Sequence, residues 1–317
     1  MKLASVLHPL SDYNLALAAQ TGVEEIVIRC PGPDLALIDD MQAKIESYGM
    51  RVGVVEGGLP IDSIKLGRDD GTEMARMKDL VRHLGERGIP IVCYNFMAGT
   101  DWIRTSIDSP ERGGARVTAF ELANLDHARI PGRDPYGEKG LERGADRDGL
   151  WRALEAFLTD IVPVAEEATV IMTMHPDDPP LPSLLGNDRI MYNVEGFERL
   201  VQLVPSPANA IAFCQGTFSE MAIDIPATIR RLGRHIAYVH FRDVRGTPES
   251  FVETWQDNGQ TNMVEAMRAY REVGFDGPMR PDHVPQLIGE EGTPGYTMLG
   301  RLYAYGYIRG LIQATEG

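Results

Sequence analysis

Four apolar segments in the second half of the chain each end in a side chain that can bind a metal ion or transfer a proton. Residues 169–175 end in His175, residues 210–214 in Cys214, residues 236–244 carry His240, and residues 277–283 end in Asp282 and His283. The separations of roughly 25 to 45 residues leave room for one strand, one helix and their loops, which is the crossover that parallel strands require. We therefore predict four consecutive strand-to-helix junctions with polar residues at the strand ends.

The first half of the chain has the same alternation of short apolar runs and segments with helical periodicity. Predicted strands cover residues 3–7, 24–29, 51–55 and 90–95, and predicted helices cover residues 11–22, 33–48, 151–167, 194–203, 226–234, 263–273 and 297–312, with one more ending near residue 88. Eight strands and about eight helices predict one α/β domain over residues 1–317, a (β/α)8 TIM barrel with all carboxyl ends of its strands on one face. The competing doubly wound sheet usually has a Gly-rich phosphate-binding turn after its first strand, and none is present.

Residues 96–147 interrupt this alternation. The segment is rich in Gly, Asp and Arg and has little periodicity. Because a structureless loop of this length is unusual in a compact domain, we expect a lid-like insertion with short helices that lies over the open face of the barrel.

Charge and cysteine content narrow the class of protein. The 317 residues include 31 Lys and Arg against 46 Asp and Glu, a formal net charge of −15. That balance argues against a nucleic-acid-binding surface, which needs a basic face. Three cysteines, Cys30, Cys93 and Cys214, do not suggest a disulfide framework. No apolar run approaches the ~20 residues of a membrane span, and a cytoplasmic enzyme is expected.

His175, Cys214, His240 and Asp282 would converge at one mouth of such a barrel. A single strand-end histidine or cysteine is often only structural, but four in succession favour a metal site. Imidazole and thiolate suit borderline ions such as zinc, whereas carboxylate suits manganese or magnesium, so the residue types leave the metal open. Cys30, Cys93, His83, His127 and His235 have no such companions, and we interpret them as structural.

Two further features are expected to serve the site. The prolines of residues 172–180 fix the backbone, which suits a rigid platform for His175 and two aspartates, although a turn with solvated aspartates is the plainer interpretation. Arg104, beside Trp102, would suit a clamp on a substrate carboxylate, and the alternative is a surface arginine.

Several segments resemble the mannonate dehydratase family. They are Ile64-Lys-Leu-Gly-Arg-Asp69, Val92-Cys-Tyr-Asn-Phe-Met97, Asp101-Trp102 with Arg104-Thr105, Met174-His-Pro-Asp-Asp-Pro-Pro180, Phe213-Cys214, His240-Phe-Arg-Asp-Val244, Gly274-Phe-Asp-Gly277, Arg280-Pro-Asp-His283 and Pro294-Gly-Tyr296. The His-Pro-Asp-Asp-Pro-Pro and Arg-Pro-Asp-His motifs are specific, and the matches run from about residue 50 to about residue 300.

The resemblance implies a xylose isomerase-like barrel and dehydration of D-mannonate to 2-keto-3-deoxy-D-gluconate. It implies that His175, Cys214, His240 and Asp282 bind a divalent ion, usually Mn2+, with Fe2+, Co2+, Mg2+ and Zn2+ as alternatives. It also implies that His283 and Tyr296 form an acid–base pair of undecided order. From the matching segments we expect substrate contacts from Arg104, Trp102, Asn95, Asp177 and Arg242, and a sugar acid as the small-molecule partner. A homodimer is expected because two-fold dimers are the commonest soluble oligomers.

Three positions depart from the family pattern. Val252 stands where a histidine is expected, Asn262 where an aspartate is expected, and Val284 replaces a glycine. Metal binding is compatible with these changes, but the identity of the substrate is less certain. Two alternatives therefore remain: an isomerase or epimerase of a related sugar on the same barrel, and a diverged barrel that binds metal or sugar without catalysis or has only a structural role.

Overall fold

Eight parallel strands close into a barrel in the order β1-β14-β11-β10-β7-β4-β3-β2. Their bounds are β1 Lys2–Val6, β2 Glu25–Ile28, β3 Arg51–Glu56, β4 Ile91–Tyr94, β7 Ile171–Met174, β10 Asn209–Cys214, β11 Ile236–His240 and β14 Pro278–Arg280. The structure is a computed structural model and describes residues 1–129, 131 and 144–316. Each barrel strand overlaps one of the eight predicted strands, and the predicted TIM barrel is confirmed.

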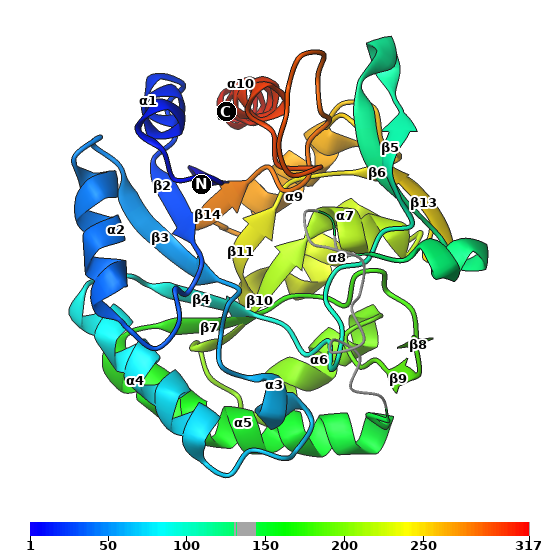
Figure 1. Cartoon of the computed structure of the whole chain (residues 1–317). Helices are drawn as coiled ribbons and strands as arrows, with labels where there is room; N and C mark the ends of the chain where they lie inside the picture. The colour runs from blue at the N-terminus through cyan, green and yellow to red at the C-terminus, as the bar shows by residue number, and fades with distance from the viewer. Residues whose placement is uncertain (130, 132–143, 317) are drawn as a thin grey trace.

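Helices surround the barrel (Figure 1). They are α1 Asp12–Gln20, α2 Ala36–Glu46, α3 Asp62–Lys65, α4 Thr72–Glu86, α5 Arg147–Ala168, α6 Val194–Leu203, α7 Gln215–Glu220, α8 Ile225–Leu232, α9 Met263–Glu272 and α10 Met298–Ala314. Side chains cap several amino termini: Ser11, Asp146, Asn193 and Asp224 each accept a hydrogen bond from a backbone amide in the first turn. Such caps satisfy amides that have no partner within the helix. The short helices α3 and α7 were not predicted. No helix in the described part of the chain is long and apolar enough to cross a membrane.

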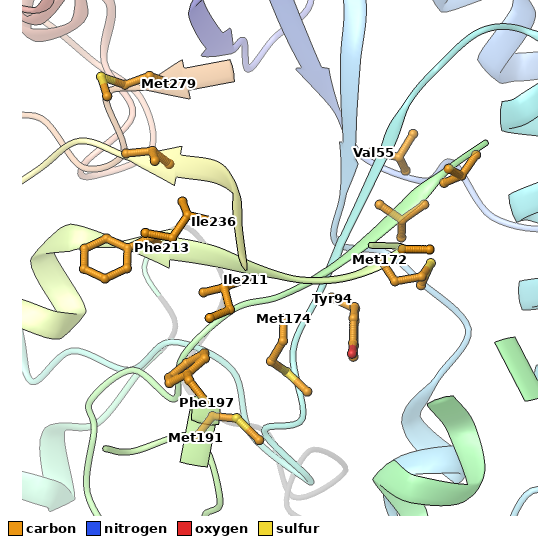
Figure 2. Packing of buried hydrophobic residues seen from close by; sticks show 14 of the residues in the cluster. Val55, Tyr94, Met172, Met174, Met191, Phe197, Ile211, Phe213, Ile236 and Met279 are labelled. Atoms are coloured by element: carbon orange, nitrogen blue, oxygen red, sulfur yellow. The ribbon is translucent and has the colours of Figure 1, made fainter. Parts of the chain in front are cut away.

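The strands separate two apolar layers because successive side chains point to opposite faces. Inside the barrel lies a small cluster with members from six strands: Ala4, Val27, Val54, Ile91, Cys93, Ala212 and Tyr238. A much larger cluster fills the space between strands and helices. Figure 2 shows part of it, including Met172 and Met174 of β7, Ile211 and Phe213 of β10 and Phe197 of α6. This alternation decides which residues enter the interior at the barrel mouth.

A second sheet lies beside the barrel. Two of its strands belong to the predicted insertion, for which only short helices were expected. The order of this sheet is β12-β13-β6-β5, all antiparallel, with bounds β5 Ser106–Pro110, β6 Arg116–Glu121, β12 Val244–Thr247 and β13 Ser250–Glu253. Between residues 96 and 129 the segment is thus built mainly from a strand pair, with two short 3-10 helices, Arg112–Gly114 and Leu122–His127. Residues 132–143 of the predicted insertion lie outside the described part of the chain. A minor sheet pairs β8 Ser183–Leu184 with β9 Asn187–Asp188.

Apolar side chains hold this second sheet in place. Phe120 of β6 and Phe251 of β13 stack with ring centroids 5.7 Å apart, in a cluster that also contains Ile103 and Val244. β12 begins four residues after the end of β11. The sheet therefore starts at the carboxyl end of the barrel, the end at which barrel enzymes carry their catalytic groups.

Candidate metal and acid–base centre

The register of the strands places the predicted metal ligands at the same height in the barrel interior. Cys214 is the direct partner of His240 between β10 and β11. Each lies two positions after an interior residue, Ala212 or Tyr238. Because the side-chain period of a strand is two residues, Cys214 and His240 point inward as well. His175 follows β7, and Asp282 follows β14 by two positions, so the donors meet above the interior core.

The structure brings the four predicted metal ligands together. One donor atom each from His175, Cys214 and His240 lies within 4.8 Å of the others. The Oδ2 atom of Asp282 lies 3.8 Å from the Sγ atom of Cys214 and 3.6 Å from the Nδ1 atom of His240. The set of two imidazoles, one thiolate and one carboxylate fits a divalent transition-metal ion.

The hydrogen bonds of the two histidines fit a metal ligand role. The Nδ1–H group of His175 donates to the backbone oxygen of Pro176 at 2.7 Å, which leaves Nε2 with its lone pair. A second partner of this kind fixes the tautomer of metal-binding histidines in general. The Nε2 atom of His240 is buried and lacks a hydrogen-bond partner among the described residues, with Glu56 Oε2 at 3.4 Å. An unpaired buried nitrogen is costly in a protein interior, and a bound cation would satisfy it.

The electrostatics of the centre also favour a cation. Burial would raise the pKa of the Cys214 thiol, but the charges of Arg242 and His175 outweigh burial and hold that pKa well below its usual range. Burial and Arg280 act to lower the pKa of His240, yet Glu56 and Asp282 raise it to about 10. The same negative charges that raise the pKa of His240 would favour a metal cation in place of the proton.

Glu56 and Arg280 support this centre and were not predicted as site residues. Arg280 donates to Asp282 Oδ1 at 2.7 Å and to Glu56 Oε1 at 2.8 Å, and Tyr238 donates to Glu56 Oε2 at 2.7 Å. Glu56, Cys93 and His240 form a second group with metal-ligand spacing. The sequence signal for Glu56 is its place at the carboxyl end of β3, the same kind of position as that of Cys214.

The predicted acid–base residues flank the Asp282 carboxylate. The Nε2 atom of His283 is 3.8 Å from Asp282 Oδ2, and the Tyr296 hydroxyl donates to Asp282 Oδ1 at 3.3 Å. Trp102 stacks on His283 with ring centroids 4.2 Å apart, which fixes the imidazole plane. Burial, together with the charge of Asp282, raises the pKa of the Tyr296 phenol well above its usual range, so the phenol keeps its proton at neutral pH.

Glu253 of β13 is the main residue that sequence reasoning missed. Its Oε1 atom lies 2.8 Å from the Nδ1 atom of His283. Burial would raise the pKa of Glu253, but Arg242, His283 and Arg104 lower it far below its usual range. Glu253 directly follows Val252, one of the three positions that depart from the family pattern, and this neighbourhood was the available sequence signal.

Arg104 and Arg242 lie in a buried ion-pair network that also contains Glu253. Arg104 donates to Asp178 and to Glu253, each at 2.5 Å. Arg242 donates to Asp282 at 2.8 Å, to Asp178 at 2.9 Å, and to Glu220 and Glu253 at 3.1 Å. Both side chains are essentially inaccessible to solvent, so Arg104 is not the surface arginine of the alternative interpretation. The Nη1 and Nη2 atoms of both arginines donate to carboxylates of the protein itself.

The remaining predicted substrate residues have different surroundings. Asn95 accepts hydrogen bonds from the Lys65 ammonium group at 3.0 Å and from the Met97 amide at 3.1 Å. Asp177 is fully buried and accepts from the amides of Ile190 and Met191 at 3.1 and 2.7 Å. The structure therefore places Asp178, rather than Asp177, with the acid–base residues.

The three substituted positions keep local structural roles. The Asn262 side chain caps α9 by accepting from the Glu265 amide at 3.2 Å. Val252 pairs with Ala119 across the second sheet, and Val284 is buried against Gly300 of α10. None of the three is one of the donors described above.

A parallel barrel with possible metal ligands at its carboxyl end defines a TIM-barrel protein with a candidate metal centre. A xylose isomerase domain protein from Planctomyces limnophilus superposes with a TM-score of 0.61 at 13% sequence identity, covering 99% of this chain and 97% of that one, and shares the fold. The crystal structure of mannonate dehydratase from Streptococcus suis serotype 2 superposes with a TM-score of 0.90 at 30% identity, covering 99% of this chain and 95% of that one.

The sequence comparisons identify the family. The profile of the D-mannonate dehydratase (UxuA) family matches residues 13–317. Mannonate dehydratase 2 of Halalkalibacterium halodurans is 34% identical over 297 residues, which cover 87% of this chain and 86% of that protein. The chain belongs to the D-mannonate dehydratase family, and the resemblance predicted from the sequence motifs is confirmed.

Proposed function

We propose that the protein dehydrates D-mannonate to 2-keto-3-deoxy-D-gluconate, and that a divalent cation held by His175, Cys214, His240 and Asp282 is required. This proposal rests mainly on one observation: Asp282 is close both to candidate metal ligands and to the candidate acid–base residues. Its carboxylate lies beside two candidate ligands and also beside His283 and Tyr296. A cation bound there would adjoin both proton-transfer groups.

The cation would supply one kind of chemistry. The proton alpha to a carboxylate is weakly acidic, and a bound divalent ion stabilises the enolate-like charge that its removal creates. We propose Mn2+, with Fe2+, Co2+, Mg2+ and Zn2+ as alternatives that the same donors accommodate.

The protein residues would divide the two proton transfers between them. The Nδ1–H group of His283 donates to Glu253, so Nε2 is free to accept the proton from carbon 2. The Tyr296 phenol, 3.3 Å from Asp282, would then protonate the hydroxyl that leaves carbon 3. General acid–base groups of this kind contribute typically ~10²–10⁴-fold to a rate.

Trp102 and Asn95 remain proposed substrate contacts, since Trp102 covers His283 and Asn95 lies beside the buried Lys65. Arg104 and Arg242 are proposed instead to hold Asp178, Glu253 and Asp282 in place. This reassigns two residues from substrate binding to support of the acid–base pair.

Product analysis tests the proposed reaction. The purified protein is incubated with Mn2+ and D-mannonate, D-gluconate or D-altronate, and products are identified by NMR in D2O. The expected result is 2-keto-3-deoxy-D-gluconate from D-mannonate. An isomerised or epimerised acid would favour the related sugar-converting chemistry, and no product from any substrate would refute the dehydratase proposal.

We also propose a cytoplasmic role in hexuronate degradation and a homodimer, the commonest symmetric assembly. Size-exclusion chromatography with light scattering tests the subunit number, and a monomeric mass would refute the dimer.

A further inference from the structure

Arg301, in the first turn of α10, is a buried guanidinium whose surroundings differ from those of the other buried arginines of the described part of the chain. Its side chain is 1% exposed, and Nε, Nη1 and Nη2 all lack hydrogen-bond partners among the described residues. Four other arginines of the described residues are buried to a similar degree, Arg104, Arg189, Arg242 and Arg280, and each has a carboxylate oxygen within 3.4 Å. Arg301 is therefore unlike them.

An unpaired buried cation is unfavourable because it loses its hydrating water and gains no protein interaction of equal strength. Burial is the main reason that the pKa of Arg301 is lowered, and the nearby charge of Arg280 acts in the same direction. The nearby carboxylate of Glu290 is already engaged: it accepts from the Leu287 amide at 2.9 Å and from the Leu299 amide at 2.6 Å. The position is thus suited to an anion that comes from outside the chain.

The location of Arg301 ties it to the acid–base pair. Its Cζ atom lies over the ring of Tyr296, 5.5 Å from the centroid. The hydroxyl group of the same ring is 3.3 Å from Asp282. A second buried polar group without a hydrogen-bond partner among the described residues, the Oγ1 atom of Thr297, lies at the N-cap of the same helix. A hydroxyl can donate to a carboxylate, so the helix start offers two kinds of donor.

We propose that Arg301 binds the carboxylate group of the sugar-acid substrate, which rests on the proposed function. The carboxylate is attached to carbon 2, from which the proton is removed, so its binding group has to lie beside the proton-transfer residues. Arg301 meets this requirement through Tyr296. Arg104 and Arg242 do not, because a substrate carboxylate at either would meet Asp178, Glu253 and other buried acids.

Charge-selective binding tests this assignment. R301M and R301K are compared with the wild type and with R309M, a change at an exposed arginine of the same helix. Each protein is loaded with Mn2+, and its metal content is checked. Affinities for D-mannonate and D-gluconate are measured by calorimetry in an H283N background, and affinity for neutral D-mannitol is measured in parallel.

The expected result is a loss of about 10- to 100-fold in affinity for both acids in R301M, the weakening that follows loss of one charge-assisted contact. The affinity of R301K should lie between those of R301M and the wild type, and D-mannitol binding and metal content should be unchanged. Guanidinium ion should partly restore D-mannonate turnover in R301M. The unfolding temperature of R301M without ligand should be equal to or above that of the wild type, because a buried unpaired charge has been removed.

Unchanged affinity for the acids in R301M, or an equal loss for D-mannitol, would overturn the assignment. If R301M does not fold, R301K decides: weaker affinity for both acids with unchanged affinity for D-mannitol would support the assignment, and wild-type affinity for the acids would overturn it. Failure of the proposed function gives a different pattern. In that case the wild type and R309M would bind both acids more tightly than R301M does, but no acid would be dehydrated.

Discussion

The Nδ1 atom of His283 lies 2.8 Å from the Oε1 atom of Glu253, although His283 follows the last barrel strand and Glu253 belongs to the second sheet, 30 positions earlier. The contact joins the barrel strand end to β13 of the second sheet. It makes Nδ1 the donor and keeps Nε2 available as an acceptor, as a carboxylate does for other catalytic histidines.

The first prediction follows from that contact. Glu253→Gln should lower kcat about 10- to 100-fold and leave bound metal unchanged, because the amide holds the imidazole less firmly and stabilises its protonated form less. Steady-state kinetics and elemental analysis check it. Glu249→Gln, an exposed change on the same hairpin, is the control, and equal rates in both variants would count against a positioning role for Glu253.

Direct removal of the base should have a larger effect. His283→Asn is expected to keep the metal and to lose about 10²–10⁴-fold in turnover. Tyr296→Phe should behave similarly, since it removes the proposed proton donor while keeping the ring against Arg301. Wild-type turnover in either variant would leave that residue without a role in proton transfer.

Metal content distinguishes the two groups of residues with ligand spacing. Cys214→Ala and His240→Ala should abolish bound metal with little change in the circular dichroism spectrum. Cys93→Ala is the matched control, because Cys93 belongs to the barrel interior and shares only the second group with His240 and Glu56. Loss of metal in Cys93→Ala but not in Cys214→Ala would reverse the assignment.

The buried ion-pair network should dominate the stability of the barrel mouth. Arg104→Met would leave Asp178 and Glu253 with one guanidinium fewer, and removal of one partner from a buried pair costs about 3–5 kcal/mol of unfolding free energy. Arg112→Met breaks an ion pair with Asp257 whose arginine is largely exposed, and such surface pairs are worth about 0–1 kcal/mol. Urea denaturation of the two variants should separate these values clearly.

The lowered pKa of Glu253 gives a pH dependence with a definite sign. Because the folded-state pKa lies below the unfolded value of about 4.3, ionised Glu253 stabilises the fold above that pH, and the contribution is lost as the pH falls further. The stability difference between the wild type and Glu253→Gln, measured by urea denaturation with a chelator present, should therefore be constant from pH 7 to 5 and shrink below about 4.3. A difference that grows in acid would contradict this linkage.

The barrel was predictable because its signal is local. Each strand is a short apolar run with a helix after it, and the alternation of interior and exterior positions follows from the two-residue period. The inward direction of Cys214 and His240 is a consequence of the same rule, so the donors of the candidate centre could be chosen before their distances were known.

The second sheet and the arginine network depend on pairings between distant residues. Phe120 and Phe251 are direct partners across β6 and β13, and no local pattern in either strand identifies the other. Arg104 meets Asp178 and Glu253 only because this sheet closes against the barrel. A lone arginine in a polar segment therefore suggested substrate binding, whereas the folded chain gives it partners of its own.

The strand that leads directly to Asp282 is also the strand that closes the ring, because β14 pairs with both β11 and β1. His175, Cys214 and His240 lie earlier in the chain. The Asp282 carboxylate joins them only when β14 pairs with its two neighbouring strands. High affinity for a metal ion would therefore require that β1 and β14 have paired. Metal occupancy would then indicate that the barrel is closed.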